Sequence, residues 1–267
     1  MKSLSSLISL EGRTALVTGG GGHIGAAVCE SLAELGAATI VLDVNEKSCN
    51  GTANSIKTTY GVEAYALPMD LTDEDAVRSV PESVLNRFGR LDILVHCAAL
   101  VGTSELEGWA VPFHDQSIDT WKKALDVNLT VPFQLTQVCT ELLTASGHGS
   151  VINVGSIYGL VGPDMGLYED TGLGNPAAYA ASKGGLIQLT RWLSTVMAPD
   201  VRVNAISAGG VWRGQPKPFH DRYVSRTPLK RMATEEDLKG AVAYLSSDLS
   251  AYVTGHNLVV DGGWIAW

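Results

Sequence analysis

The chain has 267 residues, a formal net charge of −9 and 45% hydrophobic residues, enough for a large core in one α/β domain or in two smaller domains. The acidic charge argues against nucleic acid or an anionic membrane as the main partner, and no apolar run has the length of a membrane span or a secretory signal. The four cysteines have neither C-x-x-C spacing nor a zinc pattern with histidine, so we expect no metal site and a reduced, cytoplasmic setting.

Strand and helix signals alternate along the whole chain. We expect strands over 13–18, 38–43, 62–70, 91–99, 150–156, 201–207 and 257–263. We expect helices over 24–36, in a stretch ending near 60, and over 72–89, 117–145, 177–197 and 234–248. The strands are nearly continuous apolar runs, which are typical of a parallel sheet with both faces buried. We therefore predict an α/β protein with one domain over 1–267: a doubly wound Rossmann fold with a seven-stranded parallel sheet, helices on both faces and a short flexible N-terminus over 1–10.

Two local expectations concern the helix over 72–89. Thr72 is expected as its N-cap, followed by acidic residues in the first turn that suit the helix dipole. Pro81 lies inside the same pattern. Because proline has no backbone N–H and its ring crowds the preceding turn, we expect it to bend or interrupt the helix.

The segment TGGGGHIG, residues 18–25, joins the first strand to the first helix. Glycines allow a tight turn and a close approach of a ligand, and the N-terminus of the helix that follows favours phosphate. We expect a pyrophosphate here, although the segment alone leaves open a glycine-rich loop without a ligand. The cofactor-binding candidates in it are Gly19, Gly22, His23, Ile24 and Gly25.

Residues that end strands are the next candidates, because ligands of such sheets lie beyond the carboxyl ends of the strands. Asp43 ends the second strand, where an acid binds the adenine ribose hydroxyls and repels a 2′-phosphate. No Arg or Lys stands in 20–23 or 44–45, so NAD is expected rather than NADP. A solvated turn aspartate is the alternative.

Two further strand ends supply cofactor candidates. Asp70, with Leu71, follows the third strand and would meet the adenine edge, or Asp70 would instead cap the next helix. Ala98 and Ala99 follow the fourth strand, where small side chains leave room for a flat cofactor.

Tyr179 and Lys183 lie four residues apart and so share one face of the helix over 177–197. A free tyrosine has a pKa of about 10, and a nearby ammonium stabilises the phenolate and lowers that pKa. Ser156, at the end of the fifth strand, would hydrogen-bond the substrate oxygen as charge develops there. A nicotinamide would carry the hydride and Tyr179 the proton. The Y-x-x-x-K spacing is common on helices. The prediction therefore depends on the order of the motifs along the chain, in which the glycine loop and the strand-ending serine come before this pair.

Together these residues resemble the short-chain dehydrogenase/reductase family from about Gly12 to Trp267. The matching motifs are TGGGGHIG, DVNL, INVGS, YAASK and YVTGHNLVVDGGW. The resemblance implies a catalytic set of Asn128, Ser156, Tyr179 and Lys183, in which Asn128 holds a water that links Lys183 to solvent and Lys183 also binds the nicotinamide ribose. It also implies cofactor contacts at Gly209 and Val211, and a homotetramer or homodimer with the 264–267 tail near an interface.

The sequence departs from the family pattern at several positions. His23 replaces the middle glycine of the loop, and we expect it to lie over the phosphates or to point to solvent, without a role in catalysis. The family's N-N-A-G is HCAA here, and His96 is expected to take over the bracing of the backbone by the first asparagine. Ala208 stands in place of a common proline, and Arg213 in place of a common threonine.

The interval between Ser156 and Tyr179 is longer than the family usually shows. We expect the segment 159–176 to be a loop that borders the site and helps to select the substrate, with a plain surface loop as the alternative. Trp109, Trp212 and the segment 213–223 are expected to form the opposite wall, with 213–223 as a mobile lid over the cofactor.

The function expected from these features is NAD(H)-dependent interconversion of a secondary alcohol and a ketone, with a small molecule as the substrate. GNPAAYAASKGG and GWAVPF are similar to segments of bacterial members linked to sugar and surface-glycan synthesis, which favours a polar, sugar-like substrate. The alternatives are a reductase of a non-sugar ketone such as a 3-oxoacyl compound, an NAD-binding regulatory module without turnover, and a Rossmann-type methyltransferase.

Overall fold

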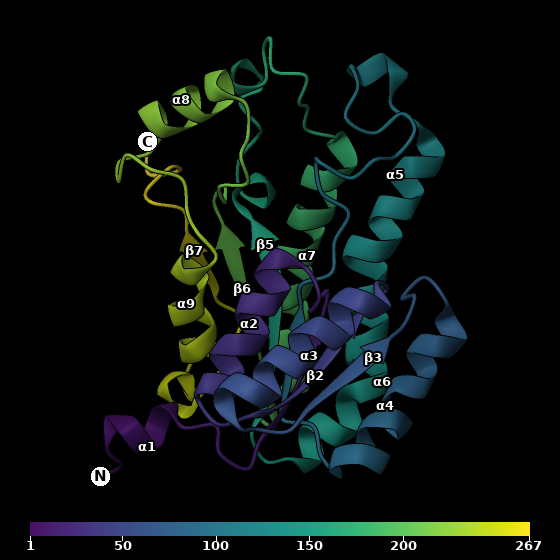
Figure 1. Ribbon diagram of the computed structural model, residues 1–267, viewed down its shortest axis with the longest axis vertical. Helices are drawn as coiled ribbons and strands as arrows, with labels where there is room; N and C mark the ends of the chain where they lie inside the picture. The colour runs from purple at the N-terminus through teal and green to yellow at the C-terminus, as the bar shows by residue number, and fades with distance from the viewer.

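A single sheet of seven parallel strands forms the centre of the computed structural model, which describes residues 1–267. The strand order is β3-β2-β1-β4-β5-β6-β7. The strands are β1 Thr14–Thr18, β2 Ala38–Asp43, β3 Ala64–Pro68, β4 Ile93–His96, β5 Gly149–Ser156, β6 Val201–Ala208 and β7 Asn257–Val260. Helices cover both faces of the sheet (Figure 1). The predicted doubly wound fold with one domain and seven parallel strands is confirmed.

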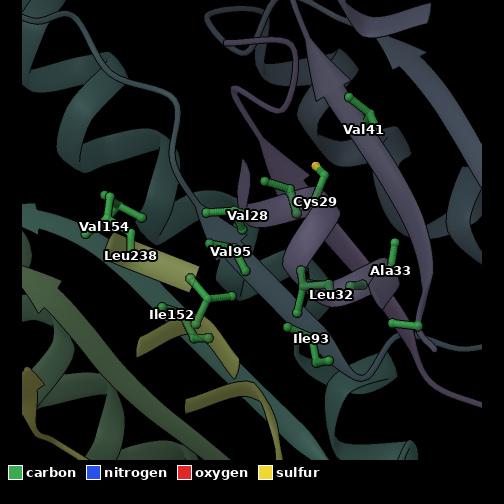
Figure 2. Packing of buried hydrophobic residues seen from close by; sticks show 14 of the residues in the cluster. Val28, Cys29, Leu32, Ala33, Val41, Ile93, Val95, Ile152, Val154 and Leu238 are labelled. Carbon is green, nitrogen blue, oxygen red and sulfur yellow. The ribbon is translucent and has the colours of Figure 1, made fainter. Parts of the chain in front are cut away.

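Nine α-helices accompany the sheet, and each face has its own group. The helices are α1 Leu4–Ile8, α2 His23–Glu34, α3 Glu46–Tyr60, α4 Glu74–Phe88, α5 Ile118–Leu125, α6 Val131–Ala145, α7 Ala177–Met197, α8 Lys217–Arg226 and α9 Glu236–Ser246. Short 3-10 turns are η1 Phe113–Asp115, η3 Ile157–Gly159, η4 Met165–Leu167 and η5 Asp248–Ser250. Core residues from α2, α3 and α9 pack on one face (Figure 2), and core residues from α4, α6 and α7 pack on the other.

The strands are buried on both faces because successive side chains point to opposite faces of the sheet. On β4, Ile93 and Val95 pack with α2 and α9, whereas Leu94 packs with α4, α6 and α7. All three side chains are 0% exposed. This explains the continuous apolar runs from which a buried parallel sheet was predicted.

The structure corrects the expected N-cap of α4 and shows that its proline does not interrupt the helix. Its N-cap is Asp73, whose carboxylate accepts hydrogen bonds from the backbone N–H groups of the first turn, while the Thr72 hydroxyl donates at 2.8 Å to Asp70. Pro81 does not interrupt the helix, which runs unbroken from Glu74 to Phe88. Buried valines before and after the proline hold the two parts of the helix on the same core.

The helix predicted over 117–145 is divided by a π-turn, η2 Asp126–Thr130, between α5 and α6. Here the N–H of Val131 donates to the carbonyl of Asp126, five residues back. Pro132 supplies a physical reason: it has no N–H for the carbonyl of Asn128, and its ring crowds that carbonyl. The chain therefore widens at Asn128, one of the predicted site residues.

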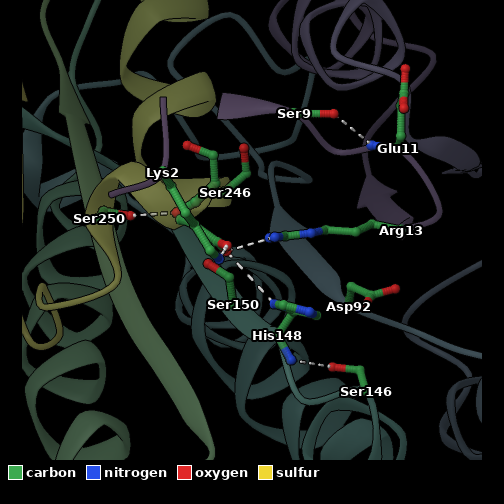
Figure 3. A network of polar contacts seen from close by, with 12 residues as sticks. Lys2, Ser9, Glu11, Arg13, Asp92, Ser146, His148, Ser150, Ser246 and Ser250 are labelled. Carbon is green, nitrogen blue, oxygen red and sulfur yellow. Dashed lines mark hydrogen bonds and ion pairs between the residues drawn. The ribbon is translucent and has the colours of Figure 1, made fainter. Parts of the chain in front are cut away.

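The N-terminal segment packs at the end of the sheet where the strands begin. Arg13 donates to Asp248 at 2.6 Å, and Lys2 and His148 lie 3.4 and 3.6 Å from the same carboxylate (Figure 3). Within the segment 1–10, expected to be flexible, residues 4–8 form α1 and Leu10 is fully buried, so packing fixes at least its end. None of the helices has the length and apolar character needed to cross a membrane.

Candidate active site

The glycine loop after β1 is shaped so tightly that side chains are excluded at two of its predicted positions. Gly19 has a φ of +65°, and a Cβ on it would lie 2.8 Å from the backbone N of Ala98. A Cβ on Gly25 would lie 2.0 Å from the carbonyl oxygen of Gly19. Helix α2 starts directly after Gly22 without a side-chain cap, which leaves N–H groups of its first turn for an anion. The loop therefore fits a pyrophosphate.

The structure brings Asp43 to this loop. One carboxylate oxygen of Asp43 accepts a hydrogen bond from Gly21 N at 3.0 Å, and the other accepts one from Asn45 N at 2.9 Å. The carboxylate of Asp70, in contrast, is exposed and accepts a hydrogen bond from the backbone N–H of Thr72. Leu71, beside Asp70, is 8% exposed and packs in the core. The side chain of His23 is exposed and has no hydrogen bond.

Thr18 is a structural contributor that the list of sequence candidates missed. Its hydroxyl accepts hydrogen bonds from the backbone N–H groups of Cys97 at 3.1 Å and Ala98 at 3.2 Å. The end of β1 is thereby tied to the chain that leaves β4, where Ala98 and Ala99 stand. The sequence could have indicated this role, since Thr18 directly precedes the glycines of the loop.

Asn128 holds the next residue of the segment that leaves β4, Leu100. Its side-chain oxygen accepts from Leu100 N at 2.7 Å, and its amide nitrogen donates to Leu100 O at 3.0 Å and to Ser182 Oγ at 3.1 Å. With 1% exposure, this amide is fully used by the protein. A water at Asn128, as the resemblance implies, would therefore bind the backbone carbonyl that Pro132 leaves free.

Ser156, Tyr179 and Lys183 converge where β5 ends. Lys183 Nζ donates to the carbonyl of Val154 on β5 at 2.7 Å and lies 5.9 Å from the centroid of the Tyr179 ring. The Ser156 hydroxyl lies near enough to the Tyr179 phenol to favour its ionised form. The sequence prediction that these side chains come from β5 and one face of α7 agrees with this geometry.

Comparison with known proteins identifies the family. The family model described as "Enoyl-(Acyl carrier protein) reductase" matches residues 21–265. A short-chain dehydrogenase from Leptospira borgpetersenii, solved with bound NAD+, has a TM-score of 0.84 at 33% identity and covers 99% of this chain and 96% of that chain. The chain belongs to the short-chain dehydrogenase/reductase family. It is therefore an oxidoreductase of a family that uses nicotinamide cofactors.

Two other family members show how varied the matched proteins are. The cis-4-hydroxycyclohexanecarboxylate dehydrogenase of Sinomonas cyclohexanicum is 33% identical over 259 residues, which are 95% of this chain and 97% of that protein. A gluconate 5-dehydrogenase from Burkholderia cenocepacia, solved with NADP and tartrate, has a TM-score of 0.88 at 28% identity and covers 99% of this chain and all of that chain. The cofactors in the solved members thus include both NAD and NADP.

Burial dominates the protonation of the two titratable groups of this short-chain dehydrogenase site. Loss of solvation raises the pKa of Tyr179, and the nearby Ser156 hydroxyl opposes this only in part. The expectation of a lowered pKa is therefore wrong for the free protein, because removal from water outweighs the effect of neighbouring groups. Burial also lowers the pKa of Lys183 to about 8. The phenol is protonated at neutral pH.

His96 does not take over the bracing role expected from the family pattern. Its Nε2 lies 2.9 Å from the hydroxyl of Thr136 on α6, and the side chain is 2% exposed. Burial, with the charge of Lys183 nearby, lowers the pKa of His96 to about 3, so the ring is neutral. The backbone is braced instead by Thr18 and Asn128.

Beyond β6, Gly209 lies against Tyr223 of α8, and Val211 pairs with Ala233. A Cβ on Gly209 would lie 3.0 Å from the hydroxyl oxygen of Tyr223, and this oxygen also accepts from Gly210 N at 2.6 Å. The carbonyl of Val211 accepts from the side chain of Gln215 at 2.9 Å. Within the segment 213–223, expected as a lid, residues 217–223 are helical as part of α8.

The segment 159–176 packs as a wall against α8 (Figure 1). Asp164 forms an ion pair with Arg226 of α8, and the Tyr168 and Phe219 rings contact each other at a tilt of 52°, with centroids 5.3 Å apart. Trp109 is 2% exposed and packs with the start of α7, where Tyr179 is partly buried in the same cluster. Trp212 is 44% exposed and contacts only the His220 ring among the aromatic residues.

Proposed function

We propose that this protein is an NAD(H)-dependent oxidoreductase that interconverts a secondary alcohol and a ketone on a polar, hydroxylated small molecule. The observation that carries the proposal is the convergence of Ser156, Tyr179 and Lys183 where β5 ends. The glycine loop, which excludes side chains at Gly19 and Gly25, lies at the same edge of the parallel sheet.

The preference for NAD is supported by Asp43. Its carboxylate is bound to the glycine loop through Gly21 N, where its negative charge would oppose a 2′-phosphate and its oxygens would accept from ribose hydroxyls. The proposed cofactor contacts are Gly19, Gly22, His23, Ile24, Gly25, Asp43, Asp70, Leu71, Ala98, Ala99, Tyr179, Lys183, Gly209 and Val211.

When bound, the nicotinamide supplies or accepts a hydride at the substrate carbon. In the direction of reduction, Tyr179 gives its phenolic proton to the carbonyl oxygen as that oxygen gains negative charge. Ser156 donates a hydrogen bond to the same oxygen. The ammonium of Lys183 stabilises the phenolate that remains, and a water at the Asn128 carbonyl would return a proton through Lys183.

A cytoplasmic homotetramer, or a homodimer, belongs to the same proposal. In the single chain, Trp264 is 3% exposed and packs among aromatic residues, whereas Trp267 is 74% exposed at the end of the tail. An exposed tryptophan beside a packed one suits a contact with a second copy.

Replacement of Tyr179 by Phe tests the proposal, because it removes one hydroxyl and keeps the ring. We expect turnover of NADH with a panel of polyols and keto sugars to fall by about three orders of magnitude or more, while NADH binding, followed by nicotinamide fluorescence, is unchanged. Tyr252→Phe, at a fully exposed tyrosine, is the matched control.

The rival functions give different results in the same experiment. A regulatory module would bind NADH with no turnover in the unaltered protein, and a methyltransferase would not bind NADH. Equal turnover by the unaltered protein and the Tyr179→Phe variant would overturn the assigned role of the phenol.

A further inference from the structure

Three polar side chains form a hydrogen-bonded row beside the reacting groups. Asn175 Nδ2 donates to the Tyr168 hydroxyl at 3.3 Å, and the Tyr168 hydroxyl donates to the Tyr158 hydroxyl at 3.1 Å. Tyr158 follows Ser156 by two residues, and Asn175 precedes Tyr179 by four. The row therefore connects the two backbone segments that carry the proposed catalytic hydroxyls.

One atom of this row is unpaired. Asn175 Oδ1 is closed to solvent and has no hydrogen-bond partner. Exchanging the oxygen and nitrogen of the amide would leave the nitrogen unpaired instead. An unpaired buried polar group costs about 1–3 kcal/mol, so its retention in a native structure needs an explanation. At the other end of the row, the proton of the Tyr158 hydroxyl has no acceptor in the chain.

The position of the row places it at the substrate rather than in the core. The Tyr168 hydroxyl donates to Tyr158, and the backbone N–H of Tyr158 donates to Ser156 Oγ at 3.2 Å. On its other side, the Tyr168 ring packs on Phe219 of α8. The row thus links Ser156 to the part of the segment 159–176 that packs on α8.

We propose that the Asn175 amide, held in place by Tyr168, binds a hydroxyl group on the carbon next to the reacting carbon. This inference rests on the proposed function and deepens it: the substrates are α-hydroxy ketones and the matching vicinal diols. A hydroxyl can donate to Asn175 Oδ1, which gives this buried oxygen the partner that it lacks within the chain. A substrate without this hydroxyl leaves the Asn175 oxygen unpaired, and sites of this kind discriminate strongly against substrates that lack the hydrogen-bonding group.

The test compares 2-hydroxycyclohexanone with cyclohexanone, both reduced with NADH. We expect the unaltered protein to have a kcat/KM about 10-fold to 100-fold higher for the hydroxy ketone. Asn175→Leu, similar in size, should bring this ratio close to one by lowering only the hydroxy ketone value. Tyr168→Phe should lower the ratio as well, and Asn175→Asp, which keeps an acceptor oxygen, should retain most of it. Asn86→Leu, at an exposed residue of α4, is the control.

Both ketones are measured on one preparation, so the ratio does not depend on the folded fraction. A ratio near one in the unaltered protein, an unchanged ratio in the foldable variants, or no reduction of the hydroxy ketone by a protein that binds NADH would each overturn the inference. These results leave the proposed cofactor chemistry standing. Failure to bind NADH would instead overturn the proposed function itself.

Discussion

Lys183 Nζ donates a 2.7 Å hydrogen bond to the carbonyl oxygen of Val154, two residues before Ser156. This bond fastens α7 to β5, so it fixes the position of Tyr179 relative to the serine. It also places an ammonium at a site where it is only 3% exposed. Lys183 therefore combines a positioning role with a cost in stability, and the two can be measured separately.

Replacement of Lys183 by Met should stabilise the protein at neutral pH and abolish most of its activity. Burial lowers the pKa of Lys183 from its ordinary 10.5 to about 8, so the unfolded chain binds the proton more tightly and the charge destabilises the native state below pH 8. We expect a gain of about 1–3 kcal/mol in the free energy of unfolding at neutral pH. Urea unfolding measures it.

The pH dependence gives the control for this prediction. As pH rises from about 8 to about 10.5, the unfolded chain also loses the proton, and the difference between the Met variant and the unaltered protein should shrink towards zero. A difference that stays constant over this range would mean that packing, rather than the buried charge, causes the effect.

Asp43→Asn should shift the cofactor preference towards NADPH. The amide keeps an oxygen as acceptor for one of the two N–H groups, Gly21 N or Asn45 N, that the carboxylate now holds, but it removes the negative charge opposite a 2′-phosphate. We expect the ratio of the NADPH and NADH dissociation constants to fall by about 10-fold to 100-fold, equivalent to 1.4–2.8 kcal/mol. Fluorescence titration with both cofactors measures it.

A variant of a neighbouring acidic residue distinguishes the effect of the charge at position 43 from the effect of the net charge of the protein. Glu46→Gln, in the first turn of α3, changes the net charge equally and should leave the ratio of dissociation constants unchanged. If the Asp43 and Glu46 variants behave alike, Asp43 is a solvated turn residue, the alternative left open by the sequence.

The framework of the site was predictable because strand ends can be found from sequence. Ser156 and Asp43 each follow an apolar run that only a buried strand explains, and parallel strands bring such ends to one edge of the sheet. Tyr179 and Lys183 were placed together by helical spacing alone. These inferences use local patterns, and tertiary structure did not alter them.

The parts that were missed depend on contacts between distant segments. The π-turn at Asn128 depends on the clash of Pro132 with a carbonyl, which helical periodicity does not reveal. The raised pKa of Tyr179 depends on burial under elements that come from several parts of the chain. The row formed by Tyr168 and Asn175 lies in a segment without periodicity, so its packing on α8 could be found only in three dimensions.

Thr18→Val should destabilise the protein and weaken NADH binding. Valine has the same shape but leaves the N–H groups of Cys97 and Ala98 without the oxygen that now accepts from both. We expect a loss of about 1–3 kcal/mol in the free energy of unfolding and weaker NADH binding, because Ala98 also packs against Gly19 of the cofactor loop. Thr18→Ser keeps the hydroxyl and should stay close to the unaltered protein, and a valine variant as stable as the serine variant would contradict the prediction.

His96→Asn should make the protein less sensitive to acid. In the native state the pKa of His96 is about 3, against 6.5 for the ordinary side chain, so between these values the unfolded chain binds a proton that the native protein does not. Stability from this group is therefore present above pH 6.5 and falls by about 1.4 kcal/mol for each pH unit below it. The asparagine variant lacks this loss, although it gives up the contact with Thr136 and starts from a lower value at neutral pH.

The measurement is the slope of the free energy of unfolding against pH between about 6.5 and about 4.5, taken from urea unfolding. The slope of the His96→Asn variant should be shallower than that of the unaltered protein by about 1.4 kcal/mol per pH unit. His114→Asn, at a histidine whose side chain is 80% exposed, should keep the original slope. Parallel lines for all three proteins would show that His96 is protonated in the native state, and that the polar contact with Thr136 holds a charged ring.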